Sequence, residues 1–115
     1  MKLISKKLTG DQVQEILDKK LKWILKSCRP VKVILFGSAA SGEMTDASDV
    51  DLILLFPNDA NLKEIRHALA KARPLDDWPH DLILETISGF QYQINKGGGA
   101  CWIAENEGKI LYSQE

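Results

Sequence analysis

The hydrophobic positions of this chain follow two periods, one helical and one extended. Within residues 13–25, and again within residues 62–72, apolar side chains recur every three or four positions, which predicts two amphipathic helices. Thr9 or Asp11 can cap the first helix, and Pro30 marks its end. Each helix is therefore expected to present one apolar stripe to a core.

Continuous apolar runs predict the strands. Residues 31–36 and 50–56 are almost wholly apolar and rich in branched side chains, which is typical of strands that are covered on both faces. Residues 81–84 predict a third strand, and residues 109–112 a last short strand or an extended tail. Because strands and helices alternate along the chain, we expect an α/β (α+β) fold in which helices pack on a small mixed β-sheet.

Glycines and polar residues divide the remainder. Residues 37–48 are small and polar, which predicts a loop with one short helical turn. Towards the C-terminus, a helix capped by Thr86 or Ser88 is expected to run to the glycines at 97–99, and a short helix over residues 100–106 follows.

Length and charge narrow the classes of protein. The chain has 115 residues, 44% of them apolar, which suits one domain spanning residues 1–115. Its formal net charge of −1 provides no positive field for nucleic acid, and the lysines of its first third, Lys20 among them, are expected on a solvated helix face.

Cys28 and Cys101 fit no metal-ligand spacing. With no signal peptide and no apolar run near the ~20 residues of a membrane span, we expect a cytoplasmic protein.

Two acidic residues open the second apolar run. Asp49 and Asp51 are two positions apart, so on a strand their side chains point the same way, about 7 Å apart along the backbone. Like charges held so close need a counter-charge, and carboxylate oxygens suit Mg²⁺, which takes further ligands from water and substrate phosphates. The pair favours phosphoryl or nucleotidyl transfer, although an aspartate before a strand is also a common turn residue.

Further residues point to the same chemistry. Gly37 and Ser38 end the first apolar run, where glycine lets backbone amides approach a phosphate and serine adds a hydroxyl donor. Asp81 opens the third run and can bring another carboxylate to the same end of the sheet. Two carboxylates for metal ions, a third to orient or deprotonate a hydroxyl, and donors for phosphates make up the set that a Mg²⁺-bound triphosphate requires.

The order of these residues resembles that of a known superfamily. The segment GSAASGEMTDASDVD, from Gly37 to Asp51, is similar to the signature of the DNA polymerase beta-like nucleotidyltransferases, and the short chain is similar to their minimal nucleotidyltransferase branch. The likeness covers residues 31–84 well and the ending GKILY, from Gly108 to Tyr112, more weakly. It implies a nucleotidyltransferase-like fold and the transfer of a nucleoside monophosphate with release of pyrophosphate.

The resemblance also implies a role for each motif residue. The catalytic and metal-binding carboxylates would be Asp49, Asp51 and Asp81. The nucleotide-binding residues would be Gly37, Ser38 and Ser48. Two Mg²⁺ ions would act in the active complex, with ATP as the substrate. Many members carry an arginine in the loop, where this chain has alanine or serine at positions 39–41, and this departure bears on nucleotide affinity rather than on metal binding.

A partner is implied by the resemblance alone. Minimal nucleotidyltransferases are commonly paired with a helical HEPN-type protein as antitoxin and toxin, and some transfer AMP to a tyrosine of that toxin. Two alternatives stay open, namely transfer to a small molecule, as in aminoglycoside-modifying relatives, and a non-catalytic antitoxin that acts by contact. A nucleic-acid partner is the weakest alternative, no membrane partner is expected, and a homo-oligomer is open.

Other polar and aromatic side chains are expected to have structural roles. His80 is expected in a turn, Trp23 and Trp78 in packing, and Glu85 in solvent.

Overall fold

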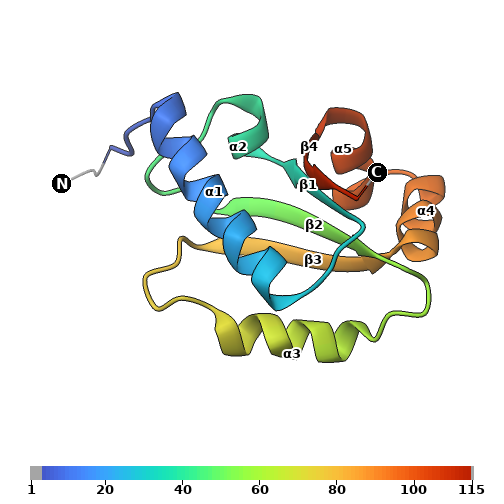
Figure 1. Cartoon of the computed structure of the whole chain (residues 1–115). Coiled ribbons are helices and arrows are strands. Elements are labelled where there is room, and N and C mark those ends of the chain that lie inside the picture. The colour runs from blue at the N-terminus through green and yellow to red at the C-terminus, as the bar shows by residue number, and fades with distance from the viewer. Residues whose placement is uncertain (1–3, 115) are drawn as a thin grey trace.

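A computed structural model describes residues 4–114, which form four strands and five helices (Figure 1). The strands are β1 (Lys32–Phe36), β2 (Val50–Phe56), β3 (His80–Thr86) and β4 (Lys109–Ser113). The helices are α1 (Gly10–Ser27), α2 (Ser38–Ser41), α3 (Leu62–Ala72), α4 (Ile87–Lys96) and α5 (Gly99–Glu107). All the predicted helices and strands are present, including the short turn α2, and the C-terminal tail forms a true strand.

The strands form one mixed sheet in the order β3-β2-β1-β4. β1 is antiparallel to β2 and to β4, whereas β2 and β3 are parallel. The C-terminal end of β1 therefore lies beside the N-terminal ends of β2 and β4, and β3 begins next to β2. The prediction of a small mixed sheet is confirmed, and both residues 37–38 and the strand-opening aspartates fall at this one end of the sheet.

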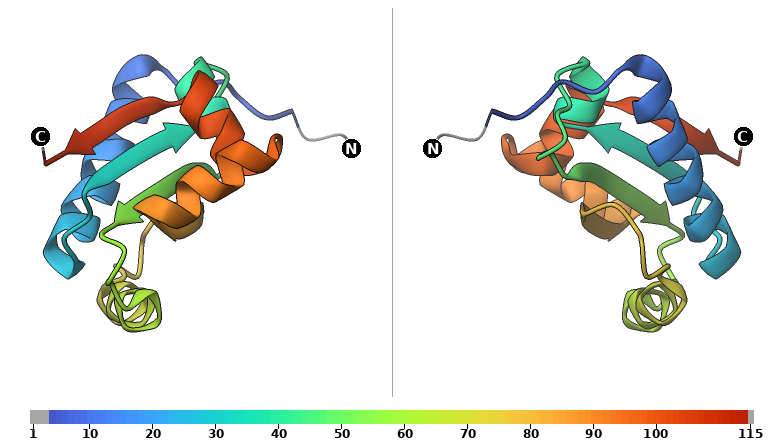
Figure 2. Two further views of the ribbon diagram at one scale, coloured as in Figure 1. Left: turned by 90° about the vertical axis from the view of Figure 1, so that its right-hand side faces the viewer. Right: turned by 90° about the vertical axis from the view of Figure 1, so that its left-hand side faces the viewer.

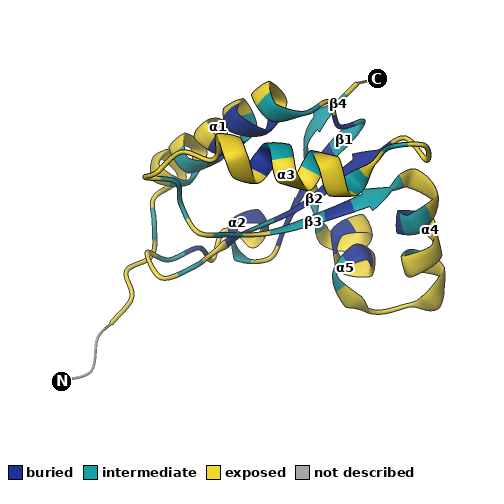
Figure 3. Ribbon diagram, turned by 90° about the horizontal axis from the view of Figure 1, so that it is seen from below, coloured by how far each residue is buried: buried dark blue, intermediate teal, exposed yellow. Residues whose placement is uncertain are grey.

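Helices cover both faces of the sheet (Figures 2 and 3). α1 and α3 pack on one face, and α4 and α5 on the other. The strand residues buried against α1 and α3 are Val33, Leu35, Val50, Leu52, Leu54, Phe56 and Leu84. Those buried against α4 and α5 are Ile34, Phe36, Ile53 and Leu55. β1 and β2 are apolar at almost every position because they are the two central strands and bury both of their faces.

The structure shows which of the candidate residues cap α1 and α4. Thr9 caps α1, because its hydroxyl accepts a hydrogen bond from the Gln12 amide while the Gln12 side chain accepts one from the Thr9 amide. Thr86, rather than Ser88, caps α4 by accepting from the amide of Gly89. None of the helices in residues 4–114 is both long and apolar enough to span a membrane.

For two side chains of α1, the burial differs from the prediction. Leu25, placed in the apolar stripe, is 38% exposed, whereas Lys20, assigned to the solvated face, is only 1% exposed. Lys20 falls in line with the buried Leu17 and Ile24 at helical spacing, so its position on the helix directs it to the core.

Candidate active site

Asp51 lies at the centre of the polar residues at one end of the sheet. Its register partner in the parallel pair β2–β3 is Asp81, and in the antiparallel pair β1–β2 it is Phe36. Residues in register on adjacent strands point to the same face, so both aspartates share the face of Ile53, which α4 and α5 cover further along. Asp49 directly precedes β2. The three aspartates therefore lie at one end of the sheet, as the sequence predicted.

The three carboxylates act on one another electrostatically. Burial, followed by the negative charges of Asp81 and Asp49, raises the pKa of Asp51 above its ordinary value. Asp51 is half-buried, whereas Asp49 and Asp81 are exposed to solvent. The site thus combines one partly desolvated carboxylate with two that a substrate can reach.

This donor set fits a hard divalent cation. Carboxylate oxygens are the preferred ligands of Mg²⁺, and a cation would offset the repulsion that perturbs Asp51. Across residues 4–114, however, no three acidic, histidine or cysteine side chains converge closely enough, as they are placed, to hold one metal ion together. Metal binding by Asp49, Asp51 and Asp81 therefore stays a prediction.

Position 37 requires a glycine because the Asp51 side chain lies close to it. It follows β1 with a φ of 73° and a ψ of −154°, a conformation that residues with a side chain rarely adopt. A Cβ at this position would lie 2.2 Å from Oδ2 of Asp51. The sequence suggested glycine for phosphate approach, and the structure adds that its missing side chain leaves room for the Asp51 carboxylate.

The other two predicted nucleotide-binding residues differ in their surroundings. Ser38 begins α2, directly after Gly37, and is half-buried. The hydroxyl of Ser48 accepts a hydrogen bond from the Thr45 amide at 2.9 Å and lies 3.1 Å from the Thr45 hydroxyl. The structure thus gives Ser48 a place in the turn before β2, and nucleotide binding by Gly37, Ser38 and Ser48 stays a prediction.

The loop between α2 and β2 is tied to the N-terminal segment. The Leu8 amide donates to the carbonyl oxygen of Met44, and the Asp46 amide donates to that of Lys6, each at 2.9 Å. The Lys6 amide in turn donates to Oδ1 of Asp46 at 3.1 Å, and Met44 is fully buried. Backbone hydrogen bonds on both sides of Thr45 therefore hold the loop that leads to Asp49.

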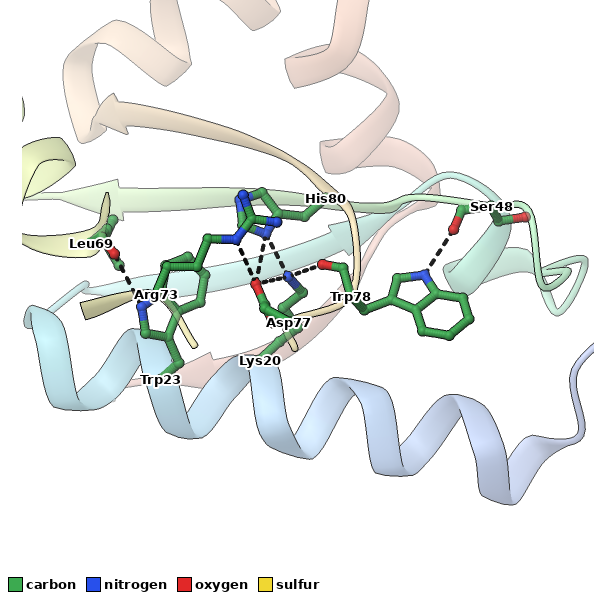
Figure 4. Close-up of polar contacts among 8 residues, drawn as sticks. All are labelled: Lys20, Trp23, Ser48, Leu69, Arg73, Asp77, Trp78 and His80. Atoms are coloured by element: carbon green, nitrogen blue, oxygen red, sulfur yellow. Dashed lines mark hydrogen bonds and ion pairs between the residues drawn. The ribbon is translucent and has the colours of Figure 1, made fainter. Parts of the chain in front are cut away.

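The sequence did not reveal a buried polar cluster beside this site (Figure 4). Nζ of Lys20 lies 2.5 Å from Oδ2 of Asp77 and 2.5 Å from Nδ1 of His80, and it also donates to the carbonyl oxygen of Trp78. The His80 side chain is 11% exposed and opens β3, so its expected place in a turn is wrong. Trp78 packs as predicted and also donates through its indole to Ser48.

Glu85 is a further correction. It is half-buried in β3 rather than solvated, and a Cβ on Gly89 of α4 would lie 2.6 Å from its Oε2. Burial, followed by the negative charge of Glu85, raises the pKa of the Cys101 thiol in α5. Glu85 therefore lies beneath α4 and α5. It is on the same face of the sheet as Asp81, because the two residues are an even number of positions apart in β3.

A cavity of about 600 Å³ lies between α1 and the segment that joins α3 to β3. Its lining includes Trp23 and Lys22 of α1 and Trp78 of the segment, but none of the three carboxylates. Asp49, Asp51 and Asp81 therefore lie outside this cavity, at the end of the sheet.

A glycine-serine turn and three carboxylates at one end of a mixed sheet define a site suited to nucleotidyl transfer. The family model of the nucleotidyltransferase domain matches residues 14–106, so the chain belongs to the nucleotidyltransferase domain family and is a nucleotidyltransferase. Among solved structures, it is similar to a crystal structure described as that of a candidate nucleotidyltransferase from Sulfolobus solfataricus, with 14% sequence identity and a TM-score of 0.58. The match covers 90% of this chain and 82% of that chain, which confirms the fold. No curated protein sequence matches the chain significantly.

Proposed function

We propose that the protein is a Mg²⁺-dependent nucleotidyltransferase that moves AMP from ATP to a hydroxyl group of a partner protein. The observation that carries the proposal is the register of Asp51 beside Asp81, with Asp49 directly before β2. This arrangement gathers three carboxylates from two strands where the glycine-serine turn also ends β1.

Each residue has a separate task in this proposal. Asp49 and Asp51 would hold Mg²⁺, and the bound ion would neutralise phosphate charge and orient the triphosphate. Ser38 would donate its hydroxyl hydrogen to a phosphate oxygen. Gly37 keeps the space that the Asp51 carboxylate occupies.

Asp81 is the proposed base for the acceptor. It is exposed, so an incoming hydroxyl can reach it, and it would accept the proton as the hydroxyl oxygen attacks the α-phosphorus. A bond from the acceptor oxygen to the α-phosphorus forms, the bond between the α- and β-phosphoryl groups breaks, and pyrophosphate leaves. The acceptor is then an AMP ester.

The proposed acceptor is a HEPN-type helical toxin, with this protein as its antitoxin. Similarity to the minimal nucleotidyltransferase branch supports this choice, and the exposure of Asp49 and Asp81 suits an acceptor presented by a second protein. Ala39 and Ala40 are buried in α2, where relatives carry a phosphate-binding arginine. That difference favours a second candidate, an antitoxin that retains the fold and acts by contact alone.

Transfer of label from α-³²P-ATP to a HEPN-type protein, in the presence of Mg²⁺, tests the proposal. Asp49→Asn and Asp51→Asn should abolish transfer because each removes a charged metal ligand. Asp59→Asn, an exposed turn residue near the other end of β2, is the matched control and should retain transfer. Inhibition of the toxin that survives both active-site substitutions would support the contact-only antitoxin, and labelling of an aminoglycoside instead would support small-molecule transfer.

A further inference from the structure

The Lys20 ammonium has all of its hydrogen-bond donors engaged by one distant segment. An ammonium carries three N–H donors and no acceptor. Its three partners, the Asp77 carboxylate, the Trp78 carbonyl oxygen and Nδ1 of His80, are 57, 58 and 60 residues further along the chain. Asp77 also accepts from Nε of Arg73 at 2.9 Å. Lys20 therefore fixes the backbone and side chains of residues 77–80 against α1.

The geometry of His80 agrees with a protonated lysine. Because Nζ of Lys20 can only donate when it is charged, Nδ1 of His80 must accept, which places the ring hydrogen of neutral His80 on Nε2. The ring stacks on Trp23, with centroids 5.3 Å apart and an interplanar angle of 19°. His80 is thus held by a hydrogen bond and by ring packing, one residue before Asp81.

The segment that Lys20 holds also binds the residues on both sides of Asp49. The indole of Trp78 donates to the carbonyl oxygen of Ser48 at 2.8 Å, and the amide of Val50 donates to the carbonyl oxygen of Pro79 at 3.0 Å. Ser48 and Val50 flank Asp49 in the chain. One short segment therefore determines where β2 begins and where β3 begins, relative to each other.

We infer that Lys20 is a positioning residue, which sets the distance between the Asp49 and Asp81 carboxylates through Asp77, Trp78 and His80. The inference rests on the metal site that the proposed function includes, but not on the transfer reaction or on its acceptor. Burying a charged pair is costly, and an apolar side chain would cover this part of the core at least as well. Three directed hydrogen bonds add what apolar packing lacks, namely one fixed arrangement of the segment. Groups that orient metal ligands commonly change metal affinity or activity by about 10–100-fold when they are removed.

Two substitutions and two controls test the inference. Lys20→Met removes the three hydrogen bonds at similar side-chain length, and Trp78→Phe removes only the bond to Ser48. Lys22→Met changes an exposed lysine of the same helix, and Trp102→Phe an indole of α5 that is 40% exposed. Mn²⁺ affinity from electron paramagnetic resonance, kcat and KM for ATP, and thermal unfolding are measured for each protein.

At a temperature where circular dichroism shows folded protein, Trp78→Phe and Lys20→Met should weaken Mn²⁺ binding about 10-fold or more and lower kcat similarly, with little change in KM. The controls should match the wild type. If Lys20→Met fails to fold, Trp78→Phe alone decides. A lower melting temperature with unchanged Mn²⁺ affinity and unchanged kcat would overturn the inference and leave the cluster a purely stabilising role.

The metal measurement also separates this inference from the proposed function. If the wild type binds Mn²⁺ but transfers no nucleotide, the proposed function fails, and a loss of Mn²⁺ affinity in Trp78→Phe still supports the positioning role. If the wild type does not bind Mn²⁺ either, there is no metal site to position and both are refuted.

Discussion

Acidification should destabilise the fold through His80. The imidazole is largely buried beside Lys20, and its surroundings disfavour a second positive charge. Burial, followed by the positive charges of Lys20 and Arg73, lowers the pKa of His80 from 6.5 to about 4, while Asp77 and Asp81 act weakly in the opposite direction. As the pH falls, the unfolded chain therefore binds this proton before the folded chain does.

The size of the effect follows from the two pKa values. The free energy of unfolding has its full value above the unfolded pKa of 6.5 and is lost as the pH falls towards the folded pKa of about 4. The difference between these values, at about 1.36 kcal/mol per pKa unit, corresponds to about 3 kcal/mol in total, of which about 2 kcal/mol is lost by pH 5. Asp77 does not interfere in this range. Burial alone would raise its pKa, but hydrogen bonds from Lys20 and Arg73 hold it below 3.8.

Urea unfolding between pH 8 and pH 5, with EDTA present, measures this loss in the wild type and in His80→Asn. Asparagine keeps an acceptor for Lys20 but does not titrate, so the contribution of Asp51 is common to both proteins and cancels. The wild type should lose about 2 kcal/mol more than the variant by pH 5. In NMR spectra assigned with His67→Gln, the His80 imidazole should titrate near pH 4. Parallel stability curves, or a His80 titration near 6.5, would refute the reasoning.

Three further substitutions test separate parts of the structure. Gly37→Ala places a Cβ 2.2 Å from Oδ2 of Asp51, at a backbone conformation that favours glycine. It should lower the free energy of unfolding in urea by about 1–3 kcal/mol and also weaken Mn²⁺ binding. Unchanged Mn²⁺ affinity would contradict the close approach. Gly108→Ala places a Cβ 2.4 Å from the Ala104 carbonyl oxygen, so it should lower stability by a similar amount without involving the carboxylates, and a neutral effect would show that α5 is packed otherwise. Trp23→Phe leaves the buried carbonyl oxygen of Leu69 without its 3.2 Å hydrogen bond, so calorimetry should show a free energy of unfolding that is lower by about 1–3 kcal/mol. An unchanged free energy of unfolding would show that water replaces the indole.

The sequence predicted the central strands and the acidic end of the sheet because both depend on local pattern. Apolar residues fill almost every position of β1 and β2, which only strands buried on both faces allow, and Asp49 and Asp51 stand where the second run begins. The register of Asp51 beside Asp81 could not be predicted in the same way. A whole helix, α3, separates β2 from β3, and the pairing depends on how that connection packs.

The Lys20 cluster was missed for a different reason. Lysine is normally solvated, and Lys20 stands among other lysines of α1, which favours a solvated face. Its spacing from Leu17 and Ile24, however, puts it in the apolar stripe. The acceptors that make burial tolerable lie 57 to 60 residues away and become visible only in three dimensions. A lysine within an apolar stripe is the signal that could have found it.

A crystal structure with Mn²⁺ and a non-hydrolysable ATP analogue would test the central claim most directly, because anomalous scattering locates the ion. We expect the Mn²⁺ peak between the carboxylates of Asp49 and Asp51, with the triphosphate beside Gly37 and the Asp81 carboxylate turned towards the α-phosphate. A peak away from these side chains, or carboxylates that point to different faces of the sheet in the complex, would contradict the account.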